Sequence, residues 1–273
     1  MTDQTPLIFA HRGLNRVAPE NTMAAFRAAY NAGVQWLEID VDILGDGTAI
    51  IIHDSTLNRT TNLTGSYNEL TSDDLTRIDA GSWFSPDFVG EPLPTLRAVV
   101  DFANVTGVNL NIEVKANTAG AAATRRLVDT VVAEIGRLKH SRVILSSFSL
   151  LTLELLRQRA PKIPRACLFE EHTLGEDWRS IAELLEVTFI HPDDAGLTEN
   201  TVRQIRTAGY GVNVWTVNDR ERAQTLFNWG ATGVFTDVAD QFLAPGTFVM
   251  PDDFGTPSAP GAPGTFVMPG AGK

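Results

Sequence analysis

The stretch GVQWLEIDVDILGDGTAIIIHD, residues 33–54, organises the rest of the chain. It predicts a strand over residues 36–40, a Gly-Asp-Gly turn and a second strand over residues 48–54. Side chains i and i+2 of a strand point to the same side, so Glu38 and Asp40 should project together as a pair of carboxylates. Two such acids repel each other unless a cation or a shared proton lies between them. This stretch alone leaves open the alternative that both acids face water on an edge strand.

Eight short, apolar strands alternate with helices along the chain. The predicted strands cover residues 7–10, 36–40, 109–115, 143–148, 165–169, 188–192, 211–217 and 233–237. Nearly continuous apolar character is typical of parallel strands that are covered on both faces. Eight such units favour a closed (β/α)₈ TIM barrel over an open doubly wound sheet. The strand over residues 48–54 is then an extra one, antiparallel at the rim.

Residues 54–93 interrupt this alternation, because they are polar and rich in turns. We expect a small inserted loop region after the second strand, with one short helix near residues 72–78. An insertion of this length in a compact domain suggests a lid or wall of a functional site.

The last thirty residues, 244–273, differ in character from the preceding barrel domain, residues 1–243. They are rich in Pro and Gly and contain the octapeptide APGTFVMP twice, at 244–251 and 262–269. No core can be built from such a segment, so a disordered, flexible tail is expected. The repeat could be a short interaction motif, but we favour a chance or cloning-derived duplication.

Composition excludes some classes of partner. The 273 residues carry a formal net charge of −11, which disfavours nucleic acid and anionic membranes as binding partners. The single cysteine, Cys167, lies in an apolar run and is expected to be buried and unreactive. We see no signal peptide and no apolar run of the ~20 residues that a membrane span needs. The sequence therefore predicts a cytoplasmic protein without stable membrane association, whose oligomeric state it does not reveal.

Reactive side chains collect at the carboxyl ends of the predicted strands, where a barrel of this kind carries its active site. They are His11, Arg12, Glu38, Asp40, His53, Glu113, Lys115, His191, Trp215 and Asp237. Glu38, Asp40 and Glu113 form an all-oxygen set suited to one Mg²⁺ or Ca²⁺. Arg12 and Lys115 beside that cation suit a phosphodiester, and two histidines could supply a general base and a general acid. Together these groups predict phosphodiester cleavage.

Several of these residues also have a purely structural interpretation. Glu113 and Lys115 could pair with each other across neighbouring strands, although we favour roles on the metal and the phosphate. Trp215 could belong to the core, and for His191 and Asp237 a site role and a structural role are equally supported. Asn21 or Thr22 is expected to cap the first helix, and Asn21 could also steady a phosphate.

The same residues resemble the glycerophosphodiester phosphodiesterase family. The resemblance covers most of residues 7–240, in the segments HRGLNRVAPENTMAAFRAAYNAG, LEIDVDILGDGTAIIIHDSTLNRTT, RIDAGSWFSPDFVGEPLPTL, NIEVK, VILSSFS, VWTVND and GVFTD. It implies a barrel that hydrolyses glycerophosphodiesters to sn-glycerol 3-phosphate and an alcohol. The roles it implies are metal ligation by Glu38, Asp40 and Glu113, acid–base catalysis by His11 and His53, phosphate binding by Arg12 and Lys115, and a pocket wall from Trp215.

Alternatives remain at this point. Leu44 and His191 depart from the threonine and asparagine common in the family, and neither change removes a catalytic group. A lysophospholipase D-like enzyme could use Trp83, Phe84 and Phe88 as a wall for an acyl chain. A barrel that only binds phosphodiesters would not need a matched acid and base. The head group, the choice between Mg²⁺ and Ca²⁺, and the choice between water and a substrate hydroxyl as nucleophile stay open.

Overall fold

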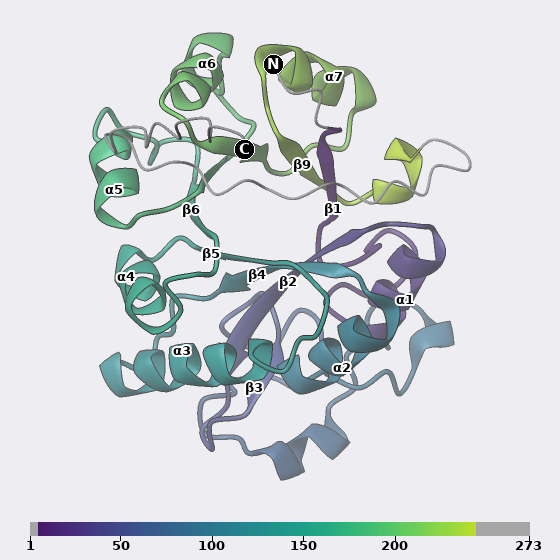
Figure 1. Cartoon of the computed structure of the whole chain (residues 1–273). Helices are drawn as coiled ribbons and strands as arrows, with labels where there is room; N and C mark the ends of the chain where they lie inside the picture. Colours follow the sequence, from purple (N-terminus) through teal and green to yellow (C-terminus); the bar gives the residue numbers. More distant parts are fainter. Residues whose placement is uncertain (1–4, 244–273) are drawn as a thin grey trace, which may run out of the picture.

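A computed structural model describes residues 5–243 of the chain. Within this range, eight parallel strands form a ring in the order β1-β9-β8-β7-β6-β5-β4-β2, which closes through pairing of β1 with β2 (Figure 1). The barrel strands are β1 (Leu7–Ala10), β2 (Trp36–Ile43), β4 (Asn109–Val114), β5 (Val143–Ser147), β6 (Arg165–Phe169), β7 (Phe189–Pro192), β8 (Gly211–Val214) and β9 (Gly233–Thr236). The predicted TIM barrel is confirmed. The predicted tail, residues 244–273, lies outside the described residues.

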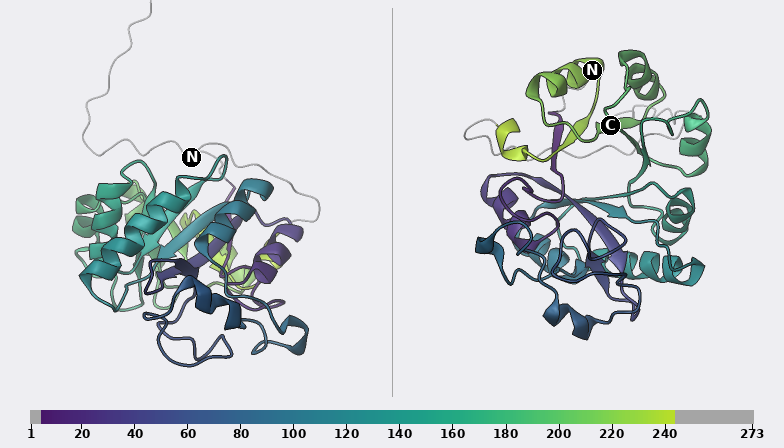
Figure 2. Two further views of the ribbon diagram at one scale, coloured as in Figure 1. Left: turned by 90° about the horizontal axis from the view of Figure 1, so that it is seen from below. Right: turned by 180° about the vertical axis from the view of Figure 1, so that it is seen from behind.

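Helices surround the barrel on its outer side (Figure 2). They are α1 (Met23–Asn31), α2 (Leu96–Thr106), α3 (Ala121–Ile135), α4 (Leu150–Arg159), α5 (Trp178–Leu184), α6 (Glu199–Thr207) and α7 (Arg220–Trp229). Within the described range, β9 is followed only by a short 3₁₀ helix, η3 (Ala239–Phe242). The last barrel strand therefore lacks, in this range, the α-helix that follows each of the other strands.

Alternation along β2 decides what the barrel encloses. At odd positions its side chains pack outward, in the main hydrophobic core beneath the helices. At even positions, Trp36 joins an apolar cluster whose members come from alternate positions of strands all around the ring. Glu38 and Asp40 follow on this inward face, toward the carboxyl end of the strand. Because apolar side chains fill the lower interior, these buried acids face the opening at the carboxyl ends.

The strand predicted over residues 36–40 continues to Ile43, because β3 (Ala49–Ile51) pairs with it antiparallel and satisfies its backbone. The antiparallel hairpin is as expected. The second strand is shorter than predicted, however, and ends at Ile51. His53 and Asp54 consequently lie in the loop after the hairpin.

The inserted region between β3 and α2 has a small hydrophobic core of its own. Leu57, Tyr67 and Ile78 are buried there against the outer side of the hairpin. The Tyr67 hydroxyl donates a hydrogen bond of 2.7 Å to Asp42 of β2, and both groups are buried. The short helix expected near residues 72–78 is present as the 3₁₀ helix η1 (Ser72–Arg77), and a second 3₁₀ helix, η2 (Pro86–Phe88), follows. The insertion is thus a packed wall fixed to the barrel.

Candidate active site

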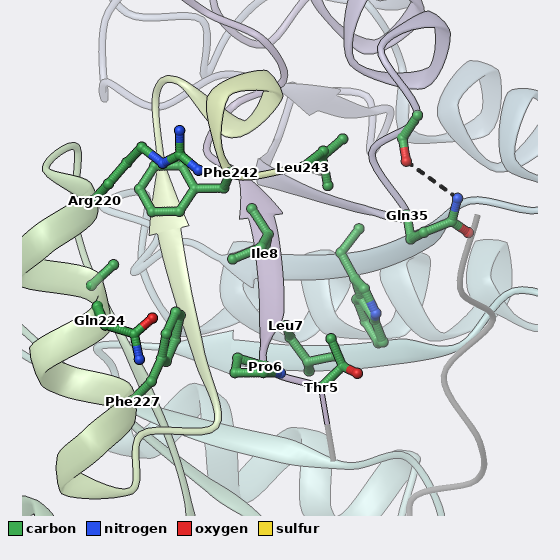
Figure 3. Close-up of a pocket in the computed structure, with 13 residues that line it drawn as sticks. Thr5, Pro6, Leu7, Ile8, Gln35, Arg220, Gln224, Phe227, Phe242 and Leu243 are labelled. Carbon is green, nitrogen blue, oxygen red and sulfur yellow. Dashed lines mark hydrogen bonds between the residues drawn. The ribbon is translucent and has the colours of Figure 1, made fainter. Parts of the chain in front are cut away.

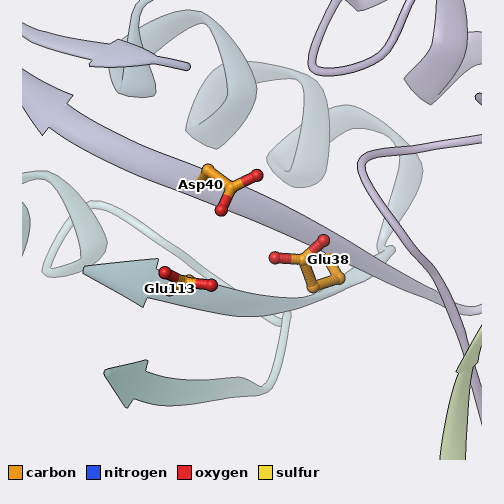
Figure 4. A group of neighbouring side chains, drawn as sticks. All are labelled: Glu38, Asp40 and Glu113. Atoms are coloured by element: carbon orange, nitrogen blue, oxygen red, sulfur yellow. The ribbon is translucent and has the colours of Figure 1, made fainter. Parts of the chain in front are cut away.

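Strand register brings three acids together at the carboxyl end of the barrel. Asp40 of β2 lies directly opposite Glu113 of β4, and Glu38 lies one step earlier on the same inward face. One carboxylate oxygen from each residue lies within 4.8 Å of the other two (Figure 4). All three side chains are buried. An all-oxygen cluster of this size fits one hard divalent cation.

The electrostatics of the cluster point to a missing positive charge. Burial and the neighbouring Asp40 and Glu113 carboxylates raise the pKa of Glu38 well above its ordinary value. Burial and Asp40 likewise raise the pKa of Glu113 to about 7. Burial also acts to raise the pKa of Asp40, but Lys115 and Arg12 outweigh it and hold this pKa below its usual range. Lys115 also forms an ion pair with Glu113, at 2.6 Å, so the two fixed cations are shared among three carboxylates. A bound metal ion would stabilise Glu38 and Glu113 in their charged form.

The loop after β1 is shaped to present Arg12. Both Arg12 and Gly13 have positive φ, at 56° and 81°. A Cβ at Gly13 would lie 2.7 Å from the Cβ of Ala25, so the close approach of α1 requires glycine at this position. The resulting turn directs the Arg12 backbone N–H to Glu38, at 2.8 Å, and its guanidinium Nε to 3.3 Å from Asp40.

Asn21 has a role different from the predicted helix cap. The N-cap of α1 is Thr22, whose hydroxyl accepts a hydrogen bond from the backbone N–H of Ala25. Asn21 takes a left-handed conformation (φ 56°) and donates a 2.8 Å hydrogen bond from its side-chain amide to Asp40. It therefore orients a member of the acidic cluster. The available signal was that Thr22 can also cap a helix, which leaves Asn21, a residue type that tolerates positive φ, free for another role.

His53 is oriented by its neighbour. Its Nδ1 donates to Asp54 Oδ1 at 2.7 Å. Arg59 of the insertion forms ion pairs with Asp54 and with Glu20 of the β1–α1 loop, at 2.8 and 2.7 Å. Glu20 in turn accepts a hydrogen bond from Arg12 at 2.9 Å. Burial lowers the pKa of His53, more than nearby Asp40 raises it, which favours the neutral imidazole that a general base requires.

His11 has an equivalent partner from the other end of the chain. Its Nδ1 donates to Asp237 Oδ1 at 2.8 Å, and this aspartate follows β9. Asn15 and Asn218 hold the two oxygens of the same carboxylate, at 2.7 and 2.8 Å. Asp237, for which the sequence left both roles open, thus lies in the site. The two asparagines were missed: Asn15 is 222 positions and Asn218 is 19 positions away from Asp237, and nothing in the local sequence links either residue to this carboxylate.

A cavity of about 460 Å³ opens beside these groups. Its walls include His11, Arg12, Glu38, His53, Asn111, Glu113, Lys115, Phe148, Glu170 and Trp215. The indole of Trp215 donates a 2.9 Å hydrogen bond to the His191 carbonyl and meets Phe148 edge to face. These contacts fix an aromatic part of the cavity wall. Of the eight residues to which the family resemblance assigns roles, all except Asp40 line this cavity.

The aromatic residues of the insertion are not part of this wall. Trp83, Phe84 and Phe88 pack edge to face on one another. None of the three lines the cavity described above. The wall for an acyl chain suggested from the sequence is therefore not part of this cavity, and the three rings pack on one another within the insertion.

His191 lies inside the barrel. It is fully buried, its Nε2 accepts a hydrogen bond from Asn213 at 3.0 Å, and its ring packs against Phe235. It supplies a carbonyl to Trp215 but does not line the cavity, which favours the structural interpretation. Burial lowers the pKa of His191 to about 3.

This burial predicts acid sensitivity. In the unfolded chain His191 binds a proton below pH about 6.5, whereas the folded protein keeps it neutral down to about 3. The unfolded state therefore binds more protons in this window, and His191 should lower stability as the pH falls, by about 1.4 kcal/mol per pH unit. Urea unfolding of His191→Gln and wild type at pH 7 and pH 5 checks this, since the variant should lose less stability on acidification. Equal losses in both proteins would contradict it.

Comparisons with known proteins agree with this geometry. Residues 11–241 match the model of the Glycerophosphoryl diester phosphodiesterase family. A glycerophosphodiester phosphodiesterase of Bacillus subtilis (strain 168) is 32% identical over 249 residues, which cover 86% of this chain and 85% of that protein. One from Caldanaerobacter subterraneus is 31% identical and covers 85% of this chain and 93% of its own length. A solved Oleispira antarctica phosphodiesterase, in complex with the product sn-glycerol-3-phosphate, matches with a TM-score of 0.81 at 30% identity, over 86% of this chain and 94% of that one.

Proposed function

The chain belongs to the glycerophosphoryl diester phosphodiesterase family and is thus a phosphoric diester hydrolase, and from this premise we propose that it hydrolyses glycerophosphodiesters to sn-glycerol 3-phosphate and an alcohol. One observation carries the proposal. Two imidazoles, each paired with its own aspartate, and a buried cluster of three carboxylates border a single cavity. Binding alone would not require this combination.

The residues around the cavity divide the work of the reaction. Arg12 and Lys115, the cations of the cavity wall, bind and orient the phosphodiester anion. Because aspartates hold both Nδ1 atoms, Nε2 of each imidazole remains for proton transfer. One histidine removes a proton from the nucleophile, water or a substrate hydroxyl, as the new P–O bond forms, and the other protonates the departing alkoxide as the old P–O bond breaks.

A divalent cation, Mg²⁺ or Ca²⁺, fits the donor set of Glu38, Asp40 and Glu113. When bound there, it would polarise the phosphoryl group and offset its negative charge. The Asn21 amide and the Arg12 backbone N–H keep two of the three carboxylates in position for it.

A panel of glycerophosphodiesters followed by phosphorus NMR tests the function. The expected product is sn-glycerol 3-phosphate, formed at a rate that falls on chelation and returns with Mg²⁺ or Ca²⁺. A transient cyclic phosphate would identify the substrate's own hydroxyl as the nucleophile, and its absence would favour water. Tight substrate binding without turnover would reject the enzyme in favour of a phosphodiester-binding barrel. Faster turnover of acylated than of deacylated substrates would favour the lysophospholipase D-like alternative.

Asp237→Asn is expected to lower kcat by about 10- to 100-fold, because the amide no longer fixes the orientation and tautomer of His11. The KM should change little, since Asp237 makes no contact with the groups proposed to bind phosphate. Asp240→Asn, an exposed acid three residues further on, is the matched control. Steady-state kinetics of both variants make the check. An unchanged kcat in Asp237→Asn would remove Asp237 from the positioning of His11.

A further inference from the structure

A second cavity lies outside the barrel, along the length of β1. It has a volume of about 450 Å³ and lies between β1 and α7 (Figure 3). Its apolar lining includes Pro6, Leu7, Ile8, Trp36, Phe227 and Phe242. We call it the α7 groove. It contains none of the residues of the candidate active site.

One face of α7 is turned toward this groove. Arg220, Ala223, Gln224 and Phe227 all line it, and their spacing of three and four residues places them along one side of the helix. A helix face with this spacing normally packs against a neighbouring element. Among residues 5–243, no residue of another α-helix lines the groove, and of the 3₁₀ helix η3 only Phe242 does.

The position of the α7 groove follows from the missing helix after β9. In a (β/α)₈ barrel, each strand is followed by a helix that covers the outer side of the ring. After β9 the described chain forms only η3, four residues long. The seam between the last helix, α7, and the first strand, β1, is consequently left open.

The chain itself leaves the described structure at this seam. Phe242 and Leu243, the last two described residues, both line the groove. The first copy of the repeated octapeptide, residues 244–251, follows directly. If this segment were extended, Phe248 and Met250 would share one face. An extended chain rises about 3.3 Å per residue, so Phe248 could reach at most about 16 Å from Leu243.

Charge also complements the groove. Exposed Arg220 lies on its rim, and no ion pair is recorded for this residue within the described range. Asp252 and Asp253 come immediately after the first octapeptide. If the first octapeptide bound in the groove, Asp252 and Asp253 would follow at the end of the bound segment, where their carboxylates could approach the Arg220 guanidinium.

We propose that residues 244–251 bind in the α7 groove and cover the seam that an eighth helix covers in a complete (β/α)₈ barrel. Phe248 and Met250 are the apolar anchors. The second copy, residues 262–269, carries the same side chains and can replace the first. The repeated octapeptide then has a structural role, in place of the chance duplication that the sequence suggests.

Crosslinking within the full chain tests the proposal. The chain has a single native cysteine, so a pair of introduced cysteines can be crosslinked with little competing reaction. Cys167 is buried, and burial raises the pKa of its thiol to about 12, so it reacts slowly with maleimides. The test protein carries Thr247→Cys with Gln224→Cys on the groove. The matched control carries Thr247→Cys with Leu184→Cys, an exposed position on α5. A short bismaleimide should join the groove pair at least about tenfold more than the control pair, through the effective concentration of the bound segment.

The anchors are tested in the same protein. Phe248→Ser with Phe266→Ser should reduce the yield of the groove crosslink to that of the control pair and lower the melting temperature, while hydrolytic activity stays unchanged. Equal yields for the groove and control pairs, or a groove yield indifferent to both serines, would overturn the proposal. Crosslinks between two chains, together with a dimer in light scattering, would overturn it in favour of a second copy as the occupant.

Discussion

His53→Ala is expected to lower kcat by about 10²- to 10⁴-fold, the range typical of a lost general acid or base. Asp54 and Arg59 hold the ring so that Nε2 faces the cavity, and burial keeps it neutral near physiological pH. Within residues 5–243, His11 is the only other imidazole that lines the cavity, and it has its own partner, Asp237. Initial rates of glycerol 3-phosphate release measure the effect.

The same loss is expected for His11→Ala, and the double variant should be little worse than either single one. Residues that act as a unit in one proton-transfer cycle give effects that are far from additive. His172→Ala is the control, because this side chain is 87% exposed. Near-normal turnover in either single variant, with His172→Ala also normal, would remove that histidine from the mechanism.

The second large effect concerns the acidic cluster. Glu38→Gln should lower kcat by about 10²- to 10³-fold, as for the loss of a major electrostatic group, and weaken the protection that Mg²⁺ or Ca²⁺ gives against thermal unfolding. The metal-free variant should nevertheless be more stable than the metal-free wild type. Glutamine avoids the burial of a carboxyl group whose pKa is raised by burial, Asp40 and Glu113, and it can still accept the Arg12 N–H.

Thermal unfolding with chelator and with added metal separates these effects. Each kcal/mol relieved in the metal-free variant should raise the melting temperature by about 2–4 °C. Glu176→Gln, an exposed acid, is the control and should change neither stability nor metal response. A metal response as large in Glu38→Gln as in wild type would show that the cation binds elsewhere.

The same measurement has an expected pH dependence. The pKa of Glu113 is raised by burial and Asp40 to about 7, whereas the unfolded chain ionises this group near 4.5. Between these values the folded metal-free protein retains a proton that the unfolded chain has lost, so its stability should fall as the pH rises. Metal binding needs the ionised carboxylate, so stabilisation by the metal should grow over the same interval.

Local sequence was sufficient for the barrel and for most of the catalytic candidates. Period-two alternation in short apolar runs separates the inward from the outward side of each strand, as Leu37 and Glu38 illustrate. The carboxyl ends of parallel strands lie at the same end of the barrel, so a polar residue after each apolar run is placed at the carboxyl-terminal end. The acids, His11 and Lys115 could be located in this way before any coordinates, whereas His53 lies in the loop after its strand.

The rest depended on neighbours that are distant along the chain. Asn21 reads locally as a helix cap, yet it binds Asp40; Asp237 reads as a strand end, yet it orients His11. Whether the aromatic rings of the insertion face the cavity was likewise decided by which surfaces they could pack against. Sequence by itself determined which side of each strand a residue occupies, because that depends on backbone periodicity alone. Only the tertiary structure decided which polar groups pair, because hydrogen bonds depend on the register and closure of the whole ring.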